Sequence, residues 1–371
     1  MNTVGGIVKW WKNFQGRRVL LLMIVGAIFF SGFSVNDNYI MQEKMPEVSD
    51  PLIGVAAYLS VGAVIGVLLH TFLLATALGK IVDADHNPNE FRHGVIDRKA
   101  LLCALAAGAI GSIATAATLW AYQGFSAAIV RPMAVLSLVL IILWENKNSL
   151  KRMFLMVVVI LLLFLGVTGV SLSPFISTTG PSFDSGKFMV LFLVFFLGAN
   201  IVTTVDELLG KEGSRNSNGA VFSFWRFVAL TVTGVIIATG YSAYVGLLGE
   251  YVRTMWEFVK SAWLSILLTM MLVFPGMGWK QTAKRYTTAG VVNVYYTMVV
   301  FFTPVLTLIF RPGIENGLPK SPEGVVLMVV SVIAVFIATL LSVSIESQKS
   351  PRQMFRDLVR PPKVETKERI A

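Results

Sequence analysis

The sequence has little charge and almost no cysteine. Only 14% of its 371 residues are charged, whereas soluble domains carry about 25%. The single cysteine, Cys103, rules out an intramolecular disulfide framework. Because 55% of the residues are hydrophobic, the composition also excludes a soluble two-domain protein and a disordered chain.

Motifs of common enzyme classes are missing as well. The chain contains no H-E-x-x-H zinc motif, no G-x-S-x-G nucleophile elbow and no nucleotide-binding P-loop. We therefore expect no cofactor and no ATP hydrolysis by this chain. The stretch from Asp83 to His93 contains acids and histidines but matches no tight zinc spacing, and it is predicted to be a solvated loop.

Long apolar runs dominate the sequence. A helix needs about 20 apolar residues to cross the hydrocarbon core of a bilayer, and each run must be helical there because every backbone polar group needs an internal partner. The expected spans are residues 19–36, 53–75, 100–120, 124–144, 150–170, 188–208, 219–241, 261–279, 288–310 and 323–344. The sequence thus predicts an all-α polytopic integral membrane protein with about ten transmembrane helices.

Lysine and arginine are unevenly distributed over this map. If the N-terminus is cytoplasmic, ten spans place both termini in the cytoplasm. The cytoplasmic segments then hold 23 of the 31 Lys and Arg residues, and the outer segments hold 6. Because cytoplasmic loops are enriched in Lys and Arg, this orientation is favoured. Arg131 and Arg226 fall well inside spans, whereas Lys151 and Arg152, at the start of the span 150–170, are counted with the cytoplasmic segment before it.

The spans fall into two halves. Residues 171–187 are rich in Ser, Thr, Pro and Gly and are predicted to be an outer linker with five spans on each side. Since five is odd, the second half must enter the membrane upside down, which is the outline of an inverted repeat. The expected order is an interfacial amphipathic segment at 1–18, a five-helix repeat at 19–170, the linker, a second repeat at 188–344 and a basic cytoplasmic tail at 345–371. Residues 244–260 are expected to form a helix on the outer surface.

Short motifs in both halves carry a family likeness. They are Ala121–Ala128, Pro132, Glu145 and Gly166-Val167 in the first half, and Ala199-Asn200, Ser223–Phe227, Ala283–Gly290, Pro304 and Ser321-Pro322 in the second. Together they resemble the drug/metabolite transporter superfamily, specifically its ten-helix EamA-like members. The resemblance implies two inverted five-helix repeats that move a substrate by alternating access. The arginine usual early in the family's second helix is absent, and Tyr58 takes its place.

Polar residues at membrane depth are the candidate substrate-binding residues, because an ionised group there is costly. They are Arg131, Asp37, Asn200, Arg226, Asn293 and Tyr296. Arg131 lies about eight residues into the fourth span. It is either a cationic anchor for a substrate carboxylate or phosphate, or a structural arginine that holds free carbonyls or an internal acid. Arg226 lies near the cytoplasmic end of its span, where a long side chain can snorkel to the interface.

The other candidates also leave two readings open. Asp37 either belongs to a solvated helix end or pairs with a cationic substrate, a proton or Arg131. Asn200 is either a hydrogen-bonding link between helices or a cavity group. Asn293 and Tyr296, at the start of the ninth span, are either interface anchors or site residues.

These features favour a secondary transporter for a small anionic or zwitterionic metabolite anchored by Arg131, with proton or exchange coupling. The alternative is a non-transporting scaffold or complex subunit, and a membrane-embedded enzyme ranks below it. Expected partners are the lipid bilayer and a small-molecule substrate; a homodimer is possible, and nucleic acid is not expected. The expected location is a bacterial cytoplasmic (inner) membrane.

Overall fold

The computed structural model describes residues 19–93, 96–146, 150–176, 185–215, 217–285, 292, 296–310 and 318–347. The expected amphipathic segment at 1–18, residues 177–184 of the linker, almost all of the basic tail and Asn293 lie outside these described residues. Throughout the described ranges the secondary structure is helical, without a strand. The predicted all-α class is therefore confirmed.

The first half of the chain contributes seven α-helices and three shorter helical turns to the described residues. They are α2 (Val19–Tyr39), η1 (Ile40–Lys44), α3 (Pro51–Leu74), η2 (Ala77–Ile81), α4 (Pro88–Arg92), α5 (Arg98–Gly124), α6 (Ala127–Ala134), α7 (Ser137–Asn146), α8 (Leu150–Leu172) and η3 (Ser173–Phe175). The second half contributes α9 (Ser185–Leu193), η4 (Val194–Ala199), α10 (Asn200–Ser214), α11 (Gly219–Tyr244), α12 (Leu248–Lys284), α14 (Val299–Phe310) and α15 (Pro322–Ser347).

Several long helices begin at a polar residue that caps their first turn. Asp50 precedes α3, Asp97 precedes α5 and Asn218 precedes α11. In each case a side-chain oxygen accepts a hydrogen bond from a backbone N–H of the first turn. These caps satisfy donors that a helix start leaves unpaired, so the helix starts follow from the sequence.

Eight helical segments of the described residues are long and apolar enough to cross a membrane. They are Pro51–Leu74, Arg98–Gly124, Ala127–Glu145, Met156–Phe175, Gly186–Ser214, Gly219–Tyr244, Leu248–Lys284 and Pro322–Ser342. Helices α2 and α14 lie within the first and ninth predicted spans, and α14 has 12 described residues. On the outside of the bundle, Leu68, Ile236 and Leu264 are 66%, 65% and 63% exposed. Such apolar surface suits contact with lipid, so the chain has the architecture of an integral membrane protein.

Two predicted elements differ from the structure. Residues 244–260 do not form a separate surface helix, because α12 runs without interruption from Leu248 to Lys284 and passes through Pro275. The predicted fourth span is not one continuous helix either. It is divided into α6 and α7 just after Pro132, which has no N–H to donate to the preceding turn.

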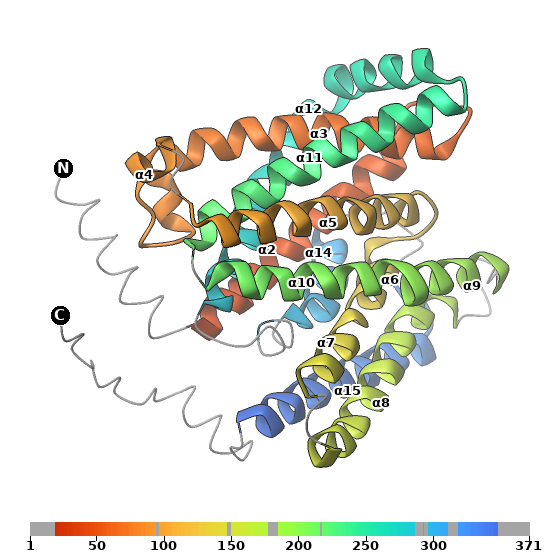
Figure 1. The fold of residues 1–371 in the computed structure, drawn as a ribbon. Coiled ribbons are helices and arrows are strands. Elements are labelled where there is room, and N and C mark those ends of the chain that lie inside the picture. Colours follow the sequence, from red (N-terminus) through yellow and green to blue (C-terminus); the bar gives the residue numbers. More distant parts are fainter. Residues whose placement is uncertain are drawn as a thin grey trace, which may run out of the picture.

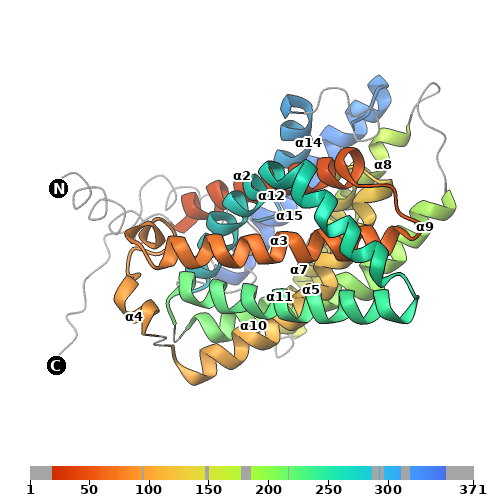
Figure 2. The same ribbon diagram turned by 90° about the horizontal axis from the view of Figure 1, so that it is seen from above.

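Helices from the two halves pack against each other throughout the bundle. Helix α5 packs on α10 and α11, α2 packs on α12 and α14, and α3 packs on α11 and α12. Helices α8 and α15 form a further pair beside this group (Figure 1). Figure 2 shows α3 and α11 side by side from a second direction. Gly108 of α5 allows the closest approach, since a Cβ atom there would lie 2.0 Å from the carbonyl oxygen of Arg226 in α11.

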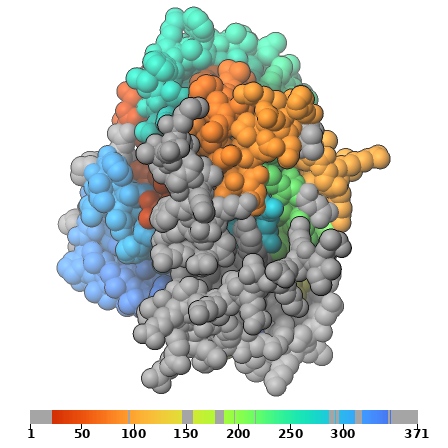
Figure 3. Space-filling view, turned by 90° about the vertical axis from the view of Figure 1, so that its left-hand side faces the viewer, coloured from red at the N-terminus to blue at the C-terminus, as the bar shows by residue number. Residues whose placement is uncertain are grey.

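The segment from η2 to α4 covers one end of the bundle, which we call the α4 end. Its orange residues form part of the surface in Figure 3. Asp83, completely buried, accepts a hydrogen bond from the backbone of Gly219 and forms an ion pair with Arg285 at 2.9 Å. His86 is also buried and contacts the carbonyl oxygen of Leu74 at 2.7 Å. Burial lowers the pKa of His86 below its ordinary value.

The prediction of a solvated loop at 83–93 is therefore wrong for its first part. This part of the loop packs against the ends of α3, α11 and α12, while Glu90 and His93 at its far end are not buried. Within the described residues, no group of three or more potential metal-ligating side chains occurs.

Candidate functional site

A cavity of about 220 Å³ lies between helices of both halves. Its lining comes from α2, α3, α5, α6 and α7 of the first half and from α10, α11, α12 and α14 of the second. Five of the six candidate residues line it, namely Asp37, Arg131, Asn200, Arg226 and Tyr296. The sixth, Asn293, is outside the described residues. The remaining wall is mainly apolar, so the polar groups stand out as potential ligand contacts.

The guanidinium of Arg131 is held against one face of α2. Its Nε donates a hydrogen bond to Ser34 Oγ at 2.6 Å, and its Cζ lies 4.6 Å and 5.2 Å from the ring centres of Phe30 and Phe33. These three α2 residues share a face because they are three or four positions apart. Within the described residues Arg131 contacts no backbone carbonyl and forms no ion pair. Its terminal N–H groups are therefore available to an anionic ligand.

The carboxylate of Asp37 lies one turn further along α2. Its Oδ1 accepts hydrogen bonds from Tyr58 OH and from Thr269 Oγ1, the second at 3.1 Å. Its Oδ2 has no hydrogen-bond donor among the described residues. Tyr58 is the residue that replaces the arginine expected from the family resemblance. Asp37 thus keeps one free oxygen in the same cavity as Arg131.

The two asparagines beside Asp37 fix this end of α2. Asn36 donates to Thr269 Oγ1 of α12 at 2.8 Å. Asn38, which is buried, donates to the carbonyl of Phe125 at 3.0 Å and accepts from the backbone N–H of Ala127 at 3.1 Å. It therefore links the end of α5 to the start of α6. The expectation of a solvated helix end is wrong, because these polar side chains bond to neighbouring helices.

Asn200 bridges the break between α6 and α7. Its Nδ2 donates to the carbonyl of Met133 at 3.1 Å, and its Oδ1 accepts from the backbone N–H of Ser137 at 3.1 Å. Thr204, one turn further along α10, donates to the carbonyl of Ser137 at 3.2 Å. A regular helix would join the Met133 carbonyl to the Ser137 N–H directly, and Asn200 pairs with both groups at the break instead. Asn200 is thus both a link between helices and part of the cavity lining.

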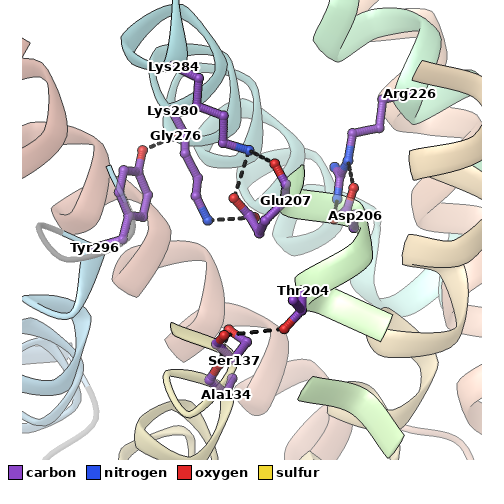
Figure 4. Close-up of polar contacts among 10 residues, drawn as sticks. All are labelled: Ala134, Ser137, Thr204, Asp206, Glu207, Arg226, Gly276, Lys280, Lys284 and Tyr296. Carbon is purple, nitrogen blue, oxygen red and sulfur yellow. Dashed lines mark hydrogen bonds and ion pairs between the residues drawn. The ribbon is translucent and has the colours of Figure 1, made fainter. Parts of the chain in front are cut away.

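Arg226 forms a buried ion pair with Asp206 (Figure 4). Arg226 Nε donates to Asp206 Oδ1 at 2.7 Å, and its Nη2 donates to the other carboxylate oxygen. The two side chains are only 9% and 7% exposed. The prediction that Arg226 snorkels to the interface is therefore wrong: an acid from α10 neutralises it inside the bundle.

Glu207, next to Asp206, is shared between two lysines of α12. Lys280 Nζ lies 2.7 Å from Glu207 Oε1, and Lys284 Nζ lies 2.7 Å from Oε2 (Figure 4). Lys284 is completely buried, whereas Lys280 lines the cavity and is 6% exposed. Lys280 Nζ also lies 4.8 Å from the ring centre of Tyr296. Tyr296 in turn donates to the carbonyl of Gly276 at 2.6 Å.

Sequence reasoning missed Glu207, Lys280 and Lys284 as site residues. It placed the two lysines in a cytoplasmic segment, because the apolar run was expected to end at residue 279. One signal was available, since residues 280 and 284 are four positions apart and share a helix face. His70 is buried at the cavity wall, between Phe227 and Phe274, and its Nε2 has no partner among the described residues.

The chain matches neither a known protein family nor a curated protein. The chemistry of the cavity must therefore be read from its own residues. It offers Arg131, which forms no direct ion pair with the described residues, the carboxylate of Asp37 with a free oxygen, and a second cationic group at Lys280, all within a mainly apolar wall. This arrangement can bind and orient a small charged molecule.

Proposed function

We propose that this protein is a secondary transporter that moves a small anionic or zwitterionic metabolite by alternating access between two inverted halves. The observation that carries the proposal is the guanidinium of Arg131, which lies in a cavity between the halves without an ion pair to the described residues. Holding an unpaired charge at membrane depth is costly unless a ligand supplies the opposite charge. Asp37, with its free Oδ2, completes a pair of opposite charges that fits the carboxylate and ammonium of a zwitterion.

The packing of the helices supports the inverted repeat. An inverted repeat pairs each helix of the first half with one of the second half, in chain order. The corresponding helices are then α2 with α9 and α10, α3 with α11, α5 with α12, α6 and α7 with α14, and α8 with α15. The packed pairs then exchange: α5–α11 becomes α12–α3, α2–α12 becomes α10–α5, and α2–α14 becomes α10–α7. The pairs α3–α11, α6–α14 and α8–α15 map onto themselves. A pseudo-two-fold axis in the membrane plane produces this pattern.

The broken helix beside Arg131 is a second support. Discontinuous helices near the bilayer midplane form substrate sites in many secondary transporters, and the break between α6 and α7 follows Arg131 and Pro132 directly. We further propose that both termini and the α4 end are cytoplasmic, on the basis of the Lys and Arg distribution. The proposed location is a bacterial cytoplasmic membrane. The resemblance to the EamA-like drug/metabolite transporters agrees with this function.

Uptake into liposomes that contain only the purified chain tests the proposal. A panel of anionic and zwitterionic metabolites should include at least one that the wild type takes up in a saturable way. Arg131→Leu should fold as well as the wild type, because an unpaired charge at membrane depth is gone, yet lose uptake. Arg131→Lys should keep partial uptake with affinity weaker by about 1–3 kcal/mol, since lysine lacks the planar fork of donors.

Melting temperatures measured on the same preparations separate transport from folding. Normal uptake by a folded Arg131→Leu protein would contradict the role of Arg131. Absence of uptake for the whole panel by the wild type would favour the alternative of a non-transporting scaffold. Loss of folding in the Leu variant would instead assign Arg131 a structural role.

A further inference from the structure

The charges around the cavity do not balance. Among the described residues that line it, three side chains are basic and three are acidic: Arg131, Arg226 and Lys280, and Asp37, Asp206 and Glu207. Lys284 adds a fourth positive charge directly behind Glu207 and is completely buried. The described cavity and its immediate support therefore carry a net charge of +1. A buried net charge is unfavourable, so a ligand of charge −1 complements this cavity best.

The excess positive charge can be located. Asp206 and Arg226 neutralise each other through two hydrogen bonds. In the proposed function, Arg131 and Asp37 are neutralised by the two ends of a zwitterion. What remains is one carboxylate, Glu207, for two lysines. Of these two, only Lys280 reaches the cavity, so its ammonium is the group that a further anion can contact.

Lys280 lies close enough to Arg131 for a single small molecule to reach both. The Arg131 Cζ atom is 4.6 Å and the Lys280 Nζ atom 5.8 Å from the centre of the Phe30 ring. The separation of the two cations therefore cannot exceed the sum of these distances, 10.4 Å. Since a carbon–carbon bond is about 1.5 Å long, a chain of about four to six carbons with an acid at each end fits between them.

We infer that Lys280 is a second anion subsite of the cavity, and that the substrate class is a small zwitterion that carries one additional acidic group. This inference rests on the proposed function, because it uses Arg131 and Asp37 for the zwitterionic head. The additional acid accepts a hydrogen bond from Lys280 Nζ. The ring centres of Tyr296 and Phe30 lie 4.8 Å and 5.8 Å from that atom, so cation–π attraction helps to position the ammonium.

The test compares L-glutamate with L-glutamine, which have nearly the same shape but differ in the charge of the side chain. Binding to the purified full-length chain is measured by calorimetry. The wild type should prefer glutamate by about tenfold or more, which corresponds to about 1.4 kcal/mol and is typical of a hydrogen bond to a charged group. Lys280→Met should bring the ratio of the two dissociation constants to about one, mainly through weaker binding of glutamate. In the Lys280→Met variant, Glu207 still pairs with Lys284, so these two opposite charges balance each other.

Several variants make the result specific. Lys280→Gln, which can still donate to Glu207 but has no charge, should also lose the preference and serves if the Met variant does not fold. Lys280→Arg should keep it. Lys99→Met is the matched control, because Lys99 is an exposed lysine that pairs with Glu212 outside the cavity. Arg131→Leu should weaken both ligands alike.

The inference is overturned if the wild type binds glutamine as tightly as glutamate, or binds neither. It is equally overturned if both neutral variants at position 280 keep the preference for glutamate. The proposed function fails by a different result, the absence of uptake of any metabolite into liposomes. Uptake that depends on Arg131 but shows no preference for a second acidic group would support the transporter function and contradict the Lys280 subsite.

Discussion

Replacing Arg226 by methionine should destabilise the protein strongly, because it leaves the carboxylate of Asp206 buried without its partner. The two side chains are 9% and 7% exposed, and they are joined by two hydrogen bonds. Breaking a buried pair by removing one member costs about 3–5 kcal/mol. If both members are replaced by apolar residues of similar volume, as in Arg226→Met with Asp206→Leu, the cost should fall to about zero or change sign.

A double-mutant cycle measures this coupling. The free energy of unfolding of the wild type, both single variants and the double variant is determined in the same detergent, from denaturant titrations monitored by circular dichroism. Lys99→Met is the matched control, because the pair of Lys99 and Glu212 is exposed and solvent weakens its attraction, so its loss should change the free energy of unfolding little. A loss below about 1 kcal/mol in Arg226→Met, or a double variant as unstable as the sum of the single ones, would refute the reasoning.

Three further predictions follow from the packing and the topology. Asn200→Leu should lower the free energy of unfolding by about 1–3 kcal/mol, measured by denaturant titration, because the broken ends of α6 and α7 lose their partners; an unchanged stability would contradict the bridging role. Gly108→Val should lower the melting temperature strongly while Gly240→Ala does not, since only the first position faces another backbone within 4 Å; equal melting temperatures would show that α5 and α11 are not so close. Single cysteines at positions 85 and 250 of a cysteine-free background should be labelled from the inside and the outside of intact cells respectively, and labelling of both from one side would contradict the proposed orientation.

Much of the fold could be predicted because hydropathy and capping act locally. Asp50, Asp97 and Asn218 mark helix starts that the structure shows. The apolar stretches reveal the eight segments of the described residues that are long and apolar enough to cross a membrane. The continuation of α12 to Lys284 could not be predicted from local hydropathy or capping. Charged residues in its last turns are normally a sign that a span has ended, and only Glu207 on a distant helix makes their burial possible.

The candidate site was predictable in part for the same reason. Arg131 stood out because it lies deep in an apolar run, and it does line the cavity. Asp206 and Glu207 lie near the end of a predicted span, where a solvated position is the ordinary expectation. Their burial depends on partners on α11 and α12, and such long-range pairing leaves no periodic pattern in the sequence. The residues that sequence reasoning missed are therefore those whose charge is balanced by another helix.

Glu207 connects the proposed ligand site to the α4 end of the bundle. Its two oxygens tie α10 to Lys280, which reaches the cavity, and to Lys284, whose backbone carbonyl accepts a hydrogen bond from Lys211. The next residue, Arg285, forms the ion pair with Asp83. An acidic group of the substrate at Lys280 would compete with Glu207 for the same ammonium and so weaken one of the two ties between α10 and α12. A ligand shifts a conformational equilibrium only through contacts that differ between the two states. In the proposed transporter, this competition would therefore give substrate binding a direct means to favour opening at the α4 end.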